Sequence, residues 1–241
     1  MVLSSYAFDG SNVDAGNITI DTPQLSLVYS DIFVRTIGSG DAGNLNITTS
    51  QLSLVQESNI SASTRSEGNA GSITLKVDNL TMRDSSTVQT GTYADGNGGD
   101  LTIIAADSID IAGFREGEVD ENDGSLITFF PTAIHSVSAQ SSTGNAGNLN
   151  ISSKQINIRD QGRIMATNFG TGNAGNLNVN ANNILLDNKA FLEAETTAGN
   201  QGNINLNSNF LQLRRNSRIT TDATGTANGG NILINSPVIA G

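Results

Sequence analysis

The chain has 241 residues, with 26 glycines, 3 prolines and no cysteine, and its formal net charge is −11. The lack of cysteine excludes disulfide bonds and cysteine metal sites, and no stretch is long and apolar enough for a membrane-spanning helix. The acidic balance argues against nucleic acid or an anionic membrane as a partner, because both bind basic surfaces.

A short glycine block recurs from one end of the chain to the other, and Asn145–Ile151 (NAGNLNI) is its clearest copy. Successive copies lie 27 or 28 residues apart, with one longer interval of 48 residues. A fixed period of about 28 residues indicates a solenoid, in which each unit buries its apolar face against its neighbours. We therefore expect one domain over residues 1–241, built of eight coils. The central glycines are Gly16, Gly43, Gly71, Gly99, Gly147, Gly175, Gly202 and Gly230.

Three apolar doublets lie at fixed places in each unit. In the unit of Gly147 they are, in chain order, Leu149 with Ile151, Ile156 with Ile158, and Ile164 with Ala166. A period of two is typical of a short strand whose two apolar side chains point the same way, here into the coil. Three strands per coil predict an all-β parallel β-helix with aliphatic columns inside. We expect it to be right-handed, like other parallel crossovers.

Other repeat architectures fit the pattern less well. Leucine-rich repeats need a helical segment in each unit, whereas all three sides here alternate with the period of a strand. Calcium-binding nonapeptide repeats have a much shorter period than this one, and left-handed β-helices have sides of equal length. The sides of this repeat are unequal, which favours the right-handed form.

The glycine block is expected to form a corner of the coil. Glycine would supply the positive φ of a sharp bend, and the small residue before it would let neighbouring coils approach. The asparagines that follow the glycine would stack at about 4.8 Å and link their amides in a ladder. We assign a structural role to these residues, which are Asn148, Asn176, Asn203 and Asn231.

The first and fourth coils depart from the regular unit. In the first coil the third side includes Phe33 and Ile37, and Pro23 falls in a corner. The fourth coil carries an insertion over residues 112–133, between the second and third sides, which we expect to protrude as a loop. Its oxygen-bearing side chains either form a solvated loop or bind Ca²⁺, although their spacing is not that of a helix-loop-helix calcium site. They are Glu116, Glu118, Asp120, Glu121, Asn122 and Asp123.

The end of the insertion is aromatic. Phe129, Phe130 and Pro131 either pack over the loop as a hydrophobic latch or stay exposed as a contact point. We favour the latch, because adjacent exposed aromatic side chains reduce solubility. His135, the only histidine, is interpreted as a surface residue, since no serine or second metal ligand lies near it.

Charged residues recur at one offset, twelve past the central glycine, where Arg83, Arg159, Asp187 and Arg214 stand. In coils five to seven this offset predicts an external stack of Arg159, Asp187 and Arg214 at about 4.8 Å. Together with Arg163, Arg215 and Arg218 these arginines form a modest basic strip. The strip is either a solvated face or a contact for acidic glycans.

Both ends of the chain fall inside the repeat, whereas solenoids normally end in polar caps. We therefore expect the chain to be a piece of a longer solenoid. End-to-end self-association is a further expectation, because an open coil presents unpaired strand edges.

The corner block of Gly144–Leu149 and Gly172–Leu177, with the second-side doublet and the run Ser58–Thr64, resembles the repeat region of cyanobacterial filamentous-haemagglutinin-like exoproteins. The resemblance covers nearly the whole chain. It implies a secreted or cell-surface fibre, exported by two-partner secretion through an outer-membrane transporter. The amino-terminal secretion domain of that family has no counterpart here, so transporter recognition is not assigned to this segment.

Two functions from different classes follow. The first is a structural and adhesive shaft that projects other modules or contacts glycans, cell-surface or matrix components. No catalytic, cofactor-binding or metal-ligating residue is assigned under it. The alternative is a polysaccharide-cleaving lyase or hydrolase, which would need two carboxylates at one cleft. Glu193 and Glu195, side by side on the outer face, are the best such pair.

Overall fold

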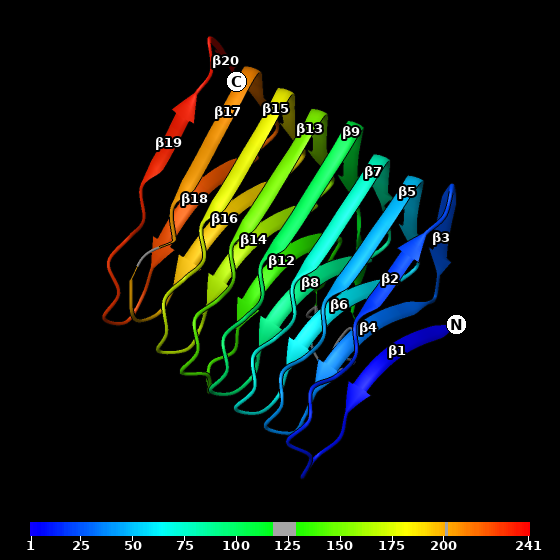
Figure 1. Ribbon diagram of the computed structural model, residues 1–241. Helices are drawn as coiled ribbons and strands as arrows, with labels where there is room; N and C mark the ends of the chain where they lie inside the picture. Colours follow the sequence, from blue (N-terminus) through cyan, green and yellow to red (C-terminus); the bar gives the residue numbers. More distant parts are fainter. Residues whose placement is uncertain (118–128, 201) are drawn as a thin grey trace, which may run out of the picture.

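The computed structural model describes residues 1–117, 129–200 and 202–241, and these contain strands but no helix. Accordingly, no described helix is long and apolar enough to cross a membrane. The strands stack in parallel sheets about one axis, and the chain ends lie at opposite ends of the stack (Figure 1). In Figure 1 the front strands run upward, those behind run downward, and the chain advances from right to left. This confirms a right-handed parallel β-helix of about eight coils, with hydrogen-bonded neighbours 27 or 28 residues apart, or 48 across the insertion.

The third side of every coil belongs to one sheet, here called sheet A, with the order β1-β4-β6-β8-β12-β14-β16-β18. Neighbouring strands pair in register, as where Ile164 of β14 pairs with Ile134 of β12 and Leu192 of β16. The strands of sheet A are β1 (Val2–Ala7), β4 (Asp31–Thr36), β6 (Asn59–Thr64), β8 (Thr87–Thr92), β12 (Ala133–Ser138), β14 (Arg163–Asn168), β16 (Phe191–Thr196) and β18 (Arg218–Ala223).

The first and second sides together form sheet B, with the order β19-β17-β15-β13-β9-β7-β5-β2 and with β3 and β20 on β5 and β17. The strands of sheet B are β2 (Ile18–Asp21), β3 (Gln24–Val28), β5 (Leu45–Val55), β7 (Ile73–Met82), β9 (Leu101–Ala112), β13 (Leu149–Arg159), β15 (Leu177–Asp187), β17 (Ile204–Leu213), β19 (Ile232–Asn235) and β20 (Val238–Ala240).

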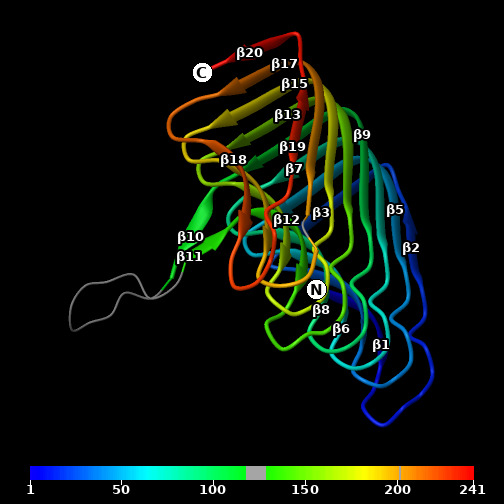
Figure 2. The same ribbon diagram turned by 90° about the vertical axis from the view of Figure 1, so that its left-hand side faces the viewer.

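In most coils the first and second sides are one continuous strand, whereas the sequence predicted two. From β5 to β17 a strand of 10 to 12 residues covers both sides and bends between them (Figure 2). In β5 the alternation of buried and exposed residues slips at Ser50 and Gln51, which are both exposed at the bend. Two separate strands occur only where Pro23 or Pro237 stands at the bend, because proline lacks the N–H that continues the ladder.

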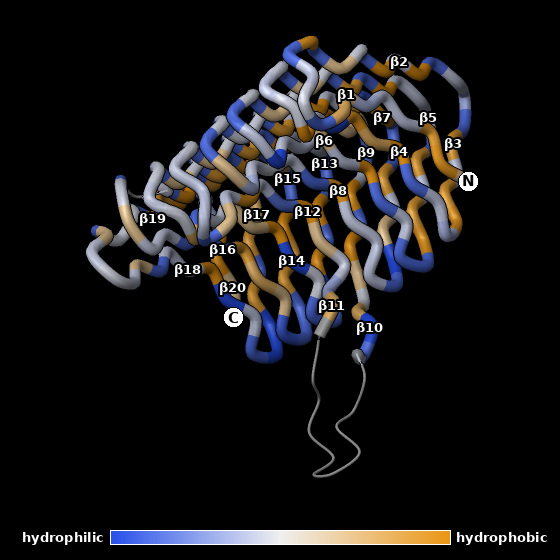
Figure 3. Tube along the Cα trace, turned by 90° about the horizontal axis from the view of Figure 1, so that it is seen from below, coloured by the Kyte–Doolittle hydropathy of each residue, from blue (hydrophilic) through white to orange (hydrophobic). Residues whose placement is uncertain are grey.

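The core consists of the inward doublets, as predicted. Leu149, Ile158, Ile164 and Ala166 are each 0% exposed in the fifth coil. Burying one such aliphatic side chain stabilises the fold by roughly 1.5–3 kcal/mol. Figure 3 shows apolar and polar residues alternating along the strands and hydrophilic residues at many of the turns.

The third side of the first coil differs in detail from the prediction. Ile32 and Val34 point inward and are fully buried. Phe33 lies between them in the sequence and therefore faces outward, where it is partly exposed beside Tyr6.

From the second coil onward, the central glycines are required for space and not for backbone conformation. A β-carbon added to Gly147 would lie 2.0 Å from the carbonyl oxygen of Gly99, in the preceding coil. The expectation that these glycines adopt positive φ is wrong. Positive φ occurs instead at the corner between the second and third sides, in non-glycine pairs such as Asp160 (53°) and Gln161 (67°).

The predicted asparagine ladder is confirmed. The Oδ1 atom of Asn148 accepts the backbone N–H of Asn176 at 3.0 Å and the side-chain Nδ2 of Asn176 at 3.3 Å. Asn176 accepts the same two groups of Asn203, and Asn203 accepts those of Asn231. Each asparagine side chain of the ladder therefore accepts hydrogen bonds from the coil that follows it.

A second ladder, which we did not predict, runs beside the first. Asn97 Oδ1 accepts the backbone N–H of Asn145 at 3.1 Å, across the insertion of the fourth coil. Asp100 Oδ1 accepts the backbone N–H of Asn148 at 2.7 Å in the same way. Both ladders thus continue through the coil that carries the insertion, and the stacking of coils is not interrupted there.

The described part of the insertion is an antiparallel hairpin of β10 (Phe114–Glu116) and β11 (Phe129–Pro131). It leaves the coil at the corner between the second and third sides and projects away from the axis (Figure 2).

Candidate binding surfaces

Cations gather at the corner between the second and third sides in coils five to seven. The turn there is made of two residues with positive φ, such as Asn188 (50°) and Lys189 (61°), or Arg215 (47°) and Asn216 (62°). This tight turn brings the end of a sheet B strand next to the start of a sheet A strand, so cations from both lie at one edge. We call this surface the basic edge and define it by Arg159, Arg163, Lys189, Arg214, Arg215 and Arg218.

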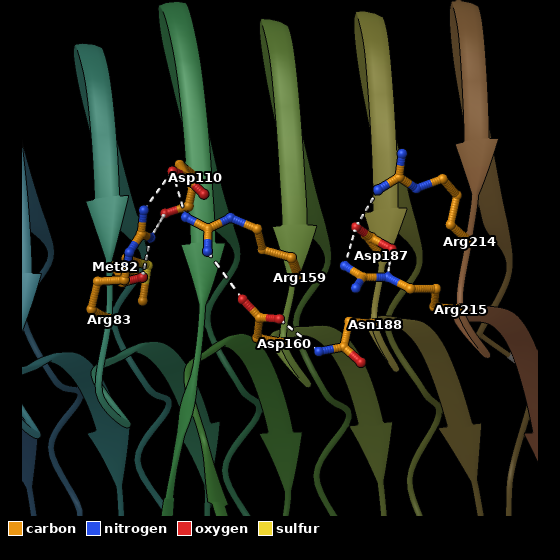
Figure 4. Close-up of polar contacts among 9 residues, drawn as sticks. All are labelled: Met82, Arg83, Asp110, Arg159, Asp160, Asp187, Asn188, Arg214 and Arg215. Carbon is orange, nitrogen blue, oxygen red and sulfur yellow. Dashed lines mark hydrogen bonds and ion pairs between the residues drawn. The ribbon is translucent and has the colours of Figure 1, made fainter.

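Two separate ion clusters lie at this corner, and Figure 4 shows both. In the first, Arg159 contacts Asp160 at 3.1 Å and Asp110 at 3.3 Å. Arg83 binds the same oxygen of Asp110 from the other side. Asn188 extends the cluster by donating from Nδ2 to Asp160 Oδ1 at 2.7 Å.

The second cluster is centred on Asp187, whose side chain is only 6% exposed. Arg215 donates from Nε to Oδ1 at 2.7 Å and from Nη2 to Oδ2 at 2.6 Å. Arg214 donates from Nη2 to Oδ2 at 2.7 Å. The hydrogen bonds from Arg215 and Arg214 hold the pKa of Asp187 well below its usual value, so this carboxyl is ionised at neutral pH.

The predicted stack of Arg159, Asp187 and Arg214 is therefore only half correct. Arg159 and Asp187 are register partners on β13 and β15, but their side chains do not pair. Arg159 turns to Asp110, which is the register partner of Asn157 and so lies on the same outer face two residues earlier. The offset between coils did not reveal this contact, because Arg159 is the register partner of Ala112 and reaches diagonally to Asp110, two positions earlier.

On the outer face of sheet A, Arg163, Phe191 and Arg218 form one column. They are register partners on β14, β16 and β18. The guanidinium carbons of Arg163 and Arg218 lie 4.8 Å and 4.2 Å from the centroid of the Phe191 ring. Burial lowers the pKa of Arg163, Glu193 opposes this shift, and the charge of Arg218 adds to it.

Glu193 and Glu195 face outward on β16, as predicted, and Asp222 of β18 is the register partner of Glu195. Burial raises the pKa of Glu195, and the nearby charges of Glu193 and Asp222 raise it further. The structure thus adds a third carboxylate, which the sequence did not single out because it belongs to the next coil.

His135 lies on the outer face of β12, between Gln89 of β8 and Met165 of β14. Its side chain faces outward but is only partly exposed, so the interpretation as a surface residue holds only in part. The burial that it does have lowers its pKa to about 4, so the imidazole is neutral at pH 7.

The hairpin is fastened to the corner of the second and third coils. Ser85 donates its hydroxyl to the carbonyl oxygen of Phe130 at 2.6 Å, and Arg115 contacts Glu57 at 3.4 Å. Phe130 is 41% exposed with Arg115 over its ring, so the latch expected for this side chain is not formed.

The calcium hypothesis falls mostly on residues outside the described part of the chain. Glu118, Asp120, Glu121, Asn122 and Asp123 belong to residues 118–128, and only Glu116 is described. Within the described ranges, no three His, Cys, Asp or Glu side chains are grouped as metal ligands would be.

A groove lined by both polar and apolar side chains follows the bend of sheet B, and the sequence did not predict it. One part, of about 620 Å³, is lined by residues that include Ser153, Lys154 and Asn207. A second part, of about 490 Å³, is lined by residues that include Lys76 and Ile104. The lining of the groove includes neither glutamate of the carboxylate pair.

Comparison with known proteins finds no family model, no curated protein and no solved structure that matches this chain.

Proposed function

We propose that this chain is a shaft segment of a large secreted or cell-surface protein of the filamentous-haemagglutinin-like kind, which attaches to surfaces or projects other modules. The observation that supports this most is the uniform stacking of the coils. Aliphatic columns inside and amide ladders outside continue through the coil that carries the hairpin. Eight coils at about 4.8 Å give a rod about 38 Å long, which holds attached modules at a fixed distance.

In this proposal the sides of the rod make the contacts. The partners are glycans or other components of cell surfaces and matrix. Export uses two-partner secretion, with an outer-membrane transporter that recognises a secretion domain elsewhere in a longer protein. The repeat resemblance described above supports this route.

A polysaccharide-cleaving enzyme is the second candidate, and one observation favours it. Glu193, Glu195 and Asp222 share the outer face of sheet A, and the pKa of Glu195 is raised, as that of a general acid would be. Acid and base carboxylates in glycoside hydrolases act on a bond that lies between them. Glu193 and Glu195 instead point the same way from one strand.

One experiment separates the two functions. The purified chain is applied to an array of polysaccharides and matrix proteins, and released reducing ends are assayed on the same polysaccharides. The shaft proposal expects binding without release. Release of oligosaccharide that is lost in Glu193→Gln would replace it with the enzyme. Absence of binding to every array component would remove the adhesive role.

A further inference from the structure

The charges of this chain are strongly segregated. Residues 159–163, 187–191 and 214–218 hold six of the 12 Lys and Arg residues but only two of the 23 Asp and Glu residues, a local balance of +4. The rest of the chain has six cations and 21 carboxylates, a balance of −15. The basic edge is therefore a positive surface on an otherwise acidic rod, and it attracts anions that the rest of the rod repels.

Several cations of this edge have N–H groups that remain available to donate hydrogen bonds to a ligand. Lys189 and Arg218 are exposed, and within the described residues neither forms an ion pair. Arg214 and Arg215 bind Asp187, but their side chains remain 47% and 62% exposed. A guanidinium has five N–H donors, and Arg215 uses Nε and one Nη2 donor on Asp187.

The edge already binds one carboxylate. Arg215 contacts both oxygens of Asp187 in the two-point geometry by which arginine recognises planar carboxylates. This contact shows that side chains of the edge bind a carboxylate at two points.

The cations also form a row along the axis. Arg163 and Arg218 are the register partners of Phe191 in the coils before and after it, and Lys189 stands in the turn two residues before Phe191. The three cations thus come from three successive coils, which stack at about 4.8 Å. A row of charges fits a linear ligand with charges at regular intervals better than it fits a compact anion. Phe191 has a guanidinium from each neighbouring coil over its ring, so this aromatic side chain offers no free face on which a nucleic acid base could stack.

From these observations we propose that the basic edge binds a linear polysaccharide whose sugars carry carboxylate groups, that is, a polyuronate. The inference rests on the proposed adhesive function and names the ligand class of one face. Exposed cations at successive coils contact successive carboxylates, and the hydrogen-bonded arginines at Asp187 hold the edge rigid.

The test measures binding of polygalacturonate to the full chain by biolayer interferometry at low ionic strength. We expect the double variant Lys189→Glu with Arg218→Glu to bind at least about tenfold more weakly. The matched control is Lys76→Glu with Lys154→Glu, which changes the net charge equally but lies at the bend of sheet B. The control should change the affinity less than about threefold, and melting temperatures confirm that both variants are folded.

Three further outcomes decide the ligand class. Methyl-esterified polygalacturonate, which keeps the sugars but loses the charges, should not bind. Equal losses in the two double variants would show that only net charge matters and would overturn the assignment of the edge. Tighter binding of a sulfated polysaccharide or of double-stranded DNA would overturn the carboxylate specificity. If polyuronate fails to bind while other array components bind elsewhere on the rod, this inference fails and the adhesive function stands.

Discussion

Asp187 shows how a single charged residue is stabilised at the surface of the rod. Its folded pKa is depressed, so its contribution to stability is present above the unfolded pKa of about 3.9 and is lost as the pH falls toward the folded pKa. We expect Asp187→Asn to lower the free energy of unfolding at pH 7 by about 1–3 kcal/mol, because charge-assisted hydrogen bonds are lost. Urea denaturation at pH 7 and pH 3 measures both effects.

The variant should also lose less stability than the wild type between pH 7 and pH 3. Asp222→Asn is the matched control, since Asp222 is exposed and has no ion pair among the described contacts. An unchanged acid dependence in Asp187→Asn would contradict the role of this carboxyl.

Gly147 tests whether the central glycines are needed for space. We expect Gly147→Ala to destabilise the fold by at least about 3 kcal/mol, because its β-carbon would overlap the carbonyl oxygen of Gly99. Gly229→Ala is the control, since its β-carbon would meet only Ala223 at 3.9 Å. Similar melting temperatures for the two variants would mean that the coils can separate to admit a methyl group.

Residue roles were only partly predictable from the sequence. The ladder role of Asn148 follows from identical residues at a constant period, so it was predicted correctly. The reason for Gly147 was not, because glycine at a corner fits both positive φ and close approach, and only coordinates separate them. Lys189 was missed, since the left-handed turn that exposes it has no glycine to mark it.

At the scale of an element, the ladders have a direction that a single exchange can test. Asn176 donates from Nδ2 to Asn148 and accepts from Asn203. Asn176→Asp keeps the acceptor but sets a carboxylate oxygen against Asn148 Oδ1, so we expect a loss of about 1–2 kcal/mol in thermal or urea unfolding.

The complementary exchange should be harmless. Asp100 already accepts hydrogen bonds from Asn148. In the preceding coil it lies beside Ser72, with which its side chain forms no hydrogen bond that the exchange could remove. Asp100→Asn preserves that acceptor, and we expect a change within about 0.5 kcal/mol. Equal effects of the two exchanges would contradict a directional ladder.

The hairpin is an addition to the coil and not a part of its stacking. Replacing residues 113–131 with Asp-Ser, the turn residues 84–85 of the third coil, gives the fourth coil the same corner as the third. We expect an unchanged circular dichroism spectrum and a melting temperature within a few degrees. The pairs of β12 with β8 and of β13 with β9 do not use the hairpin. Loss of cooperative unfolding would show that Ser85 and Glu57 need their hairpin contacts.

The strands themselves were predictable because each doublet repeats in every coil. The joining of the first two sides into one strand was not, because the backbone hydrogen bonds continue around a bend that the apolar pattern marks only by one slipped residue. The groove on that bend was missed for the same reason. The basic edge was predicted in part, through the arginines at shared offsets.

The whole molecule is a stack in which each coil contacts only its neighbours, so its stability should scale with the number of coils. Deleting residues 149–176 joins Asn148 to Leu177, which then takes the place of Leu149 against Leu101. We expect a folded protein whose urea m-value is lower by about one eighth, because m follows the surface exposed on unfolding.

A deletion of half a coil is the control. Removing residues 149–162 joins a sheet B corner to the start of β14, so the following strands lose their register with β9. This variant should lose most of its cooperative unfolding transition. If both deletions behaved alike, the coil would not be the unit of stability.

The ladder hydrogen bonds all run in the same direction along the axis, so the two ends of the stack are not equivalent. Each coil presents side-chain oxygens that accept hydrogen bonds from the following coil. A folded amino-terminal part can therefore serve as the template on which the next coil is added. A polypeptide that is delivered amino end first can fold coil by coil in this way, and each coil that folds opposes backward movement of the chain.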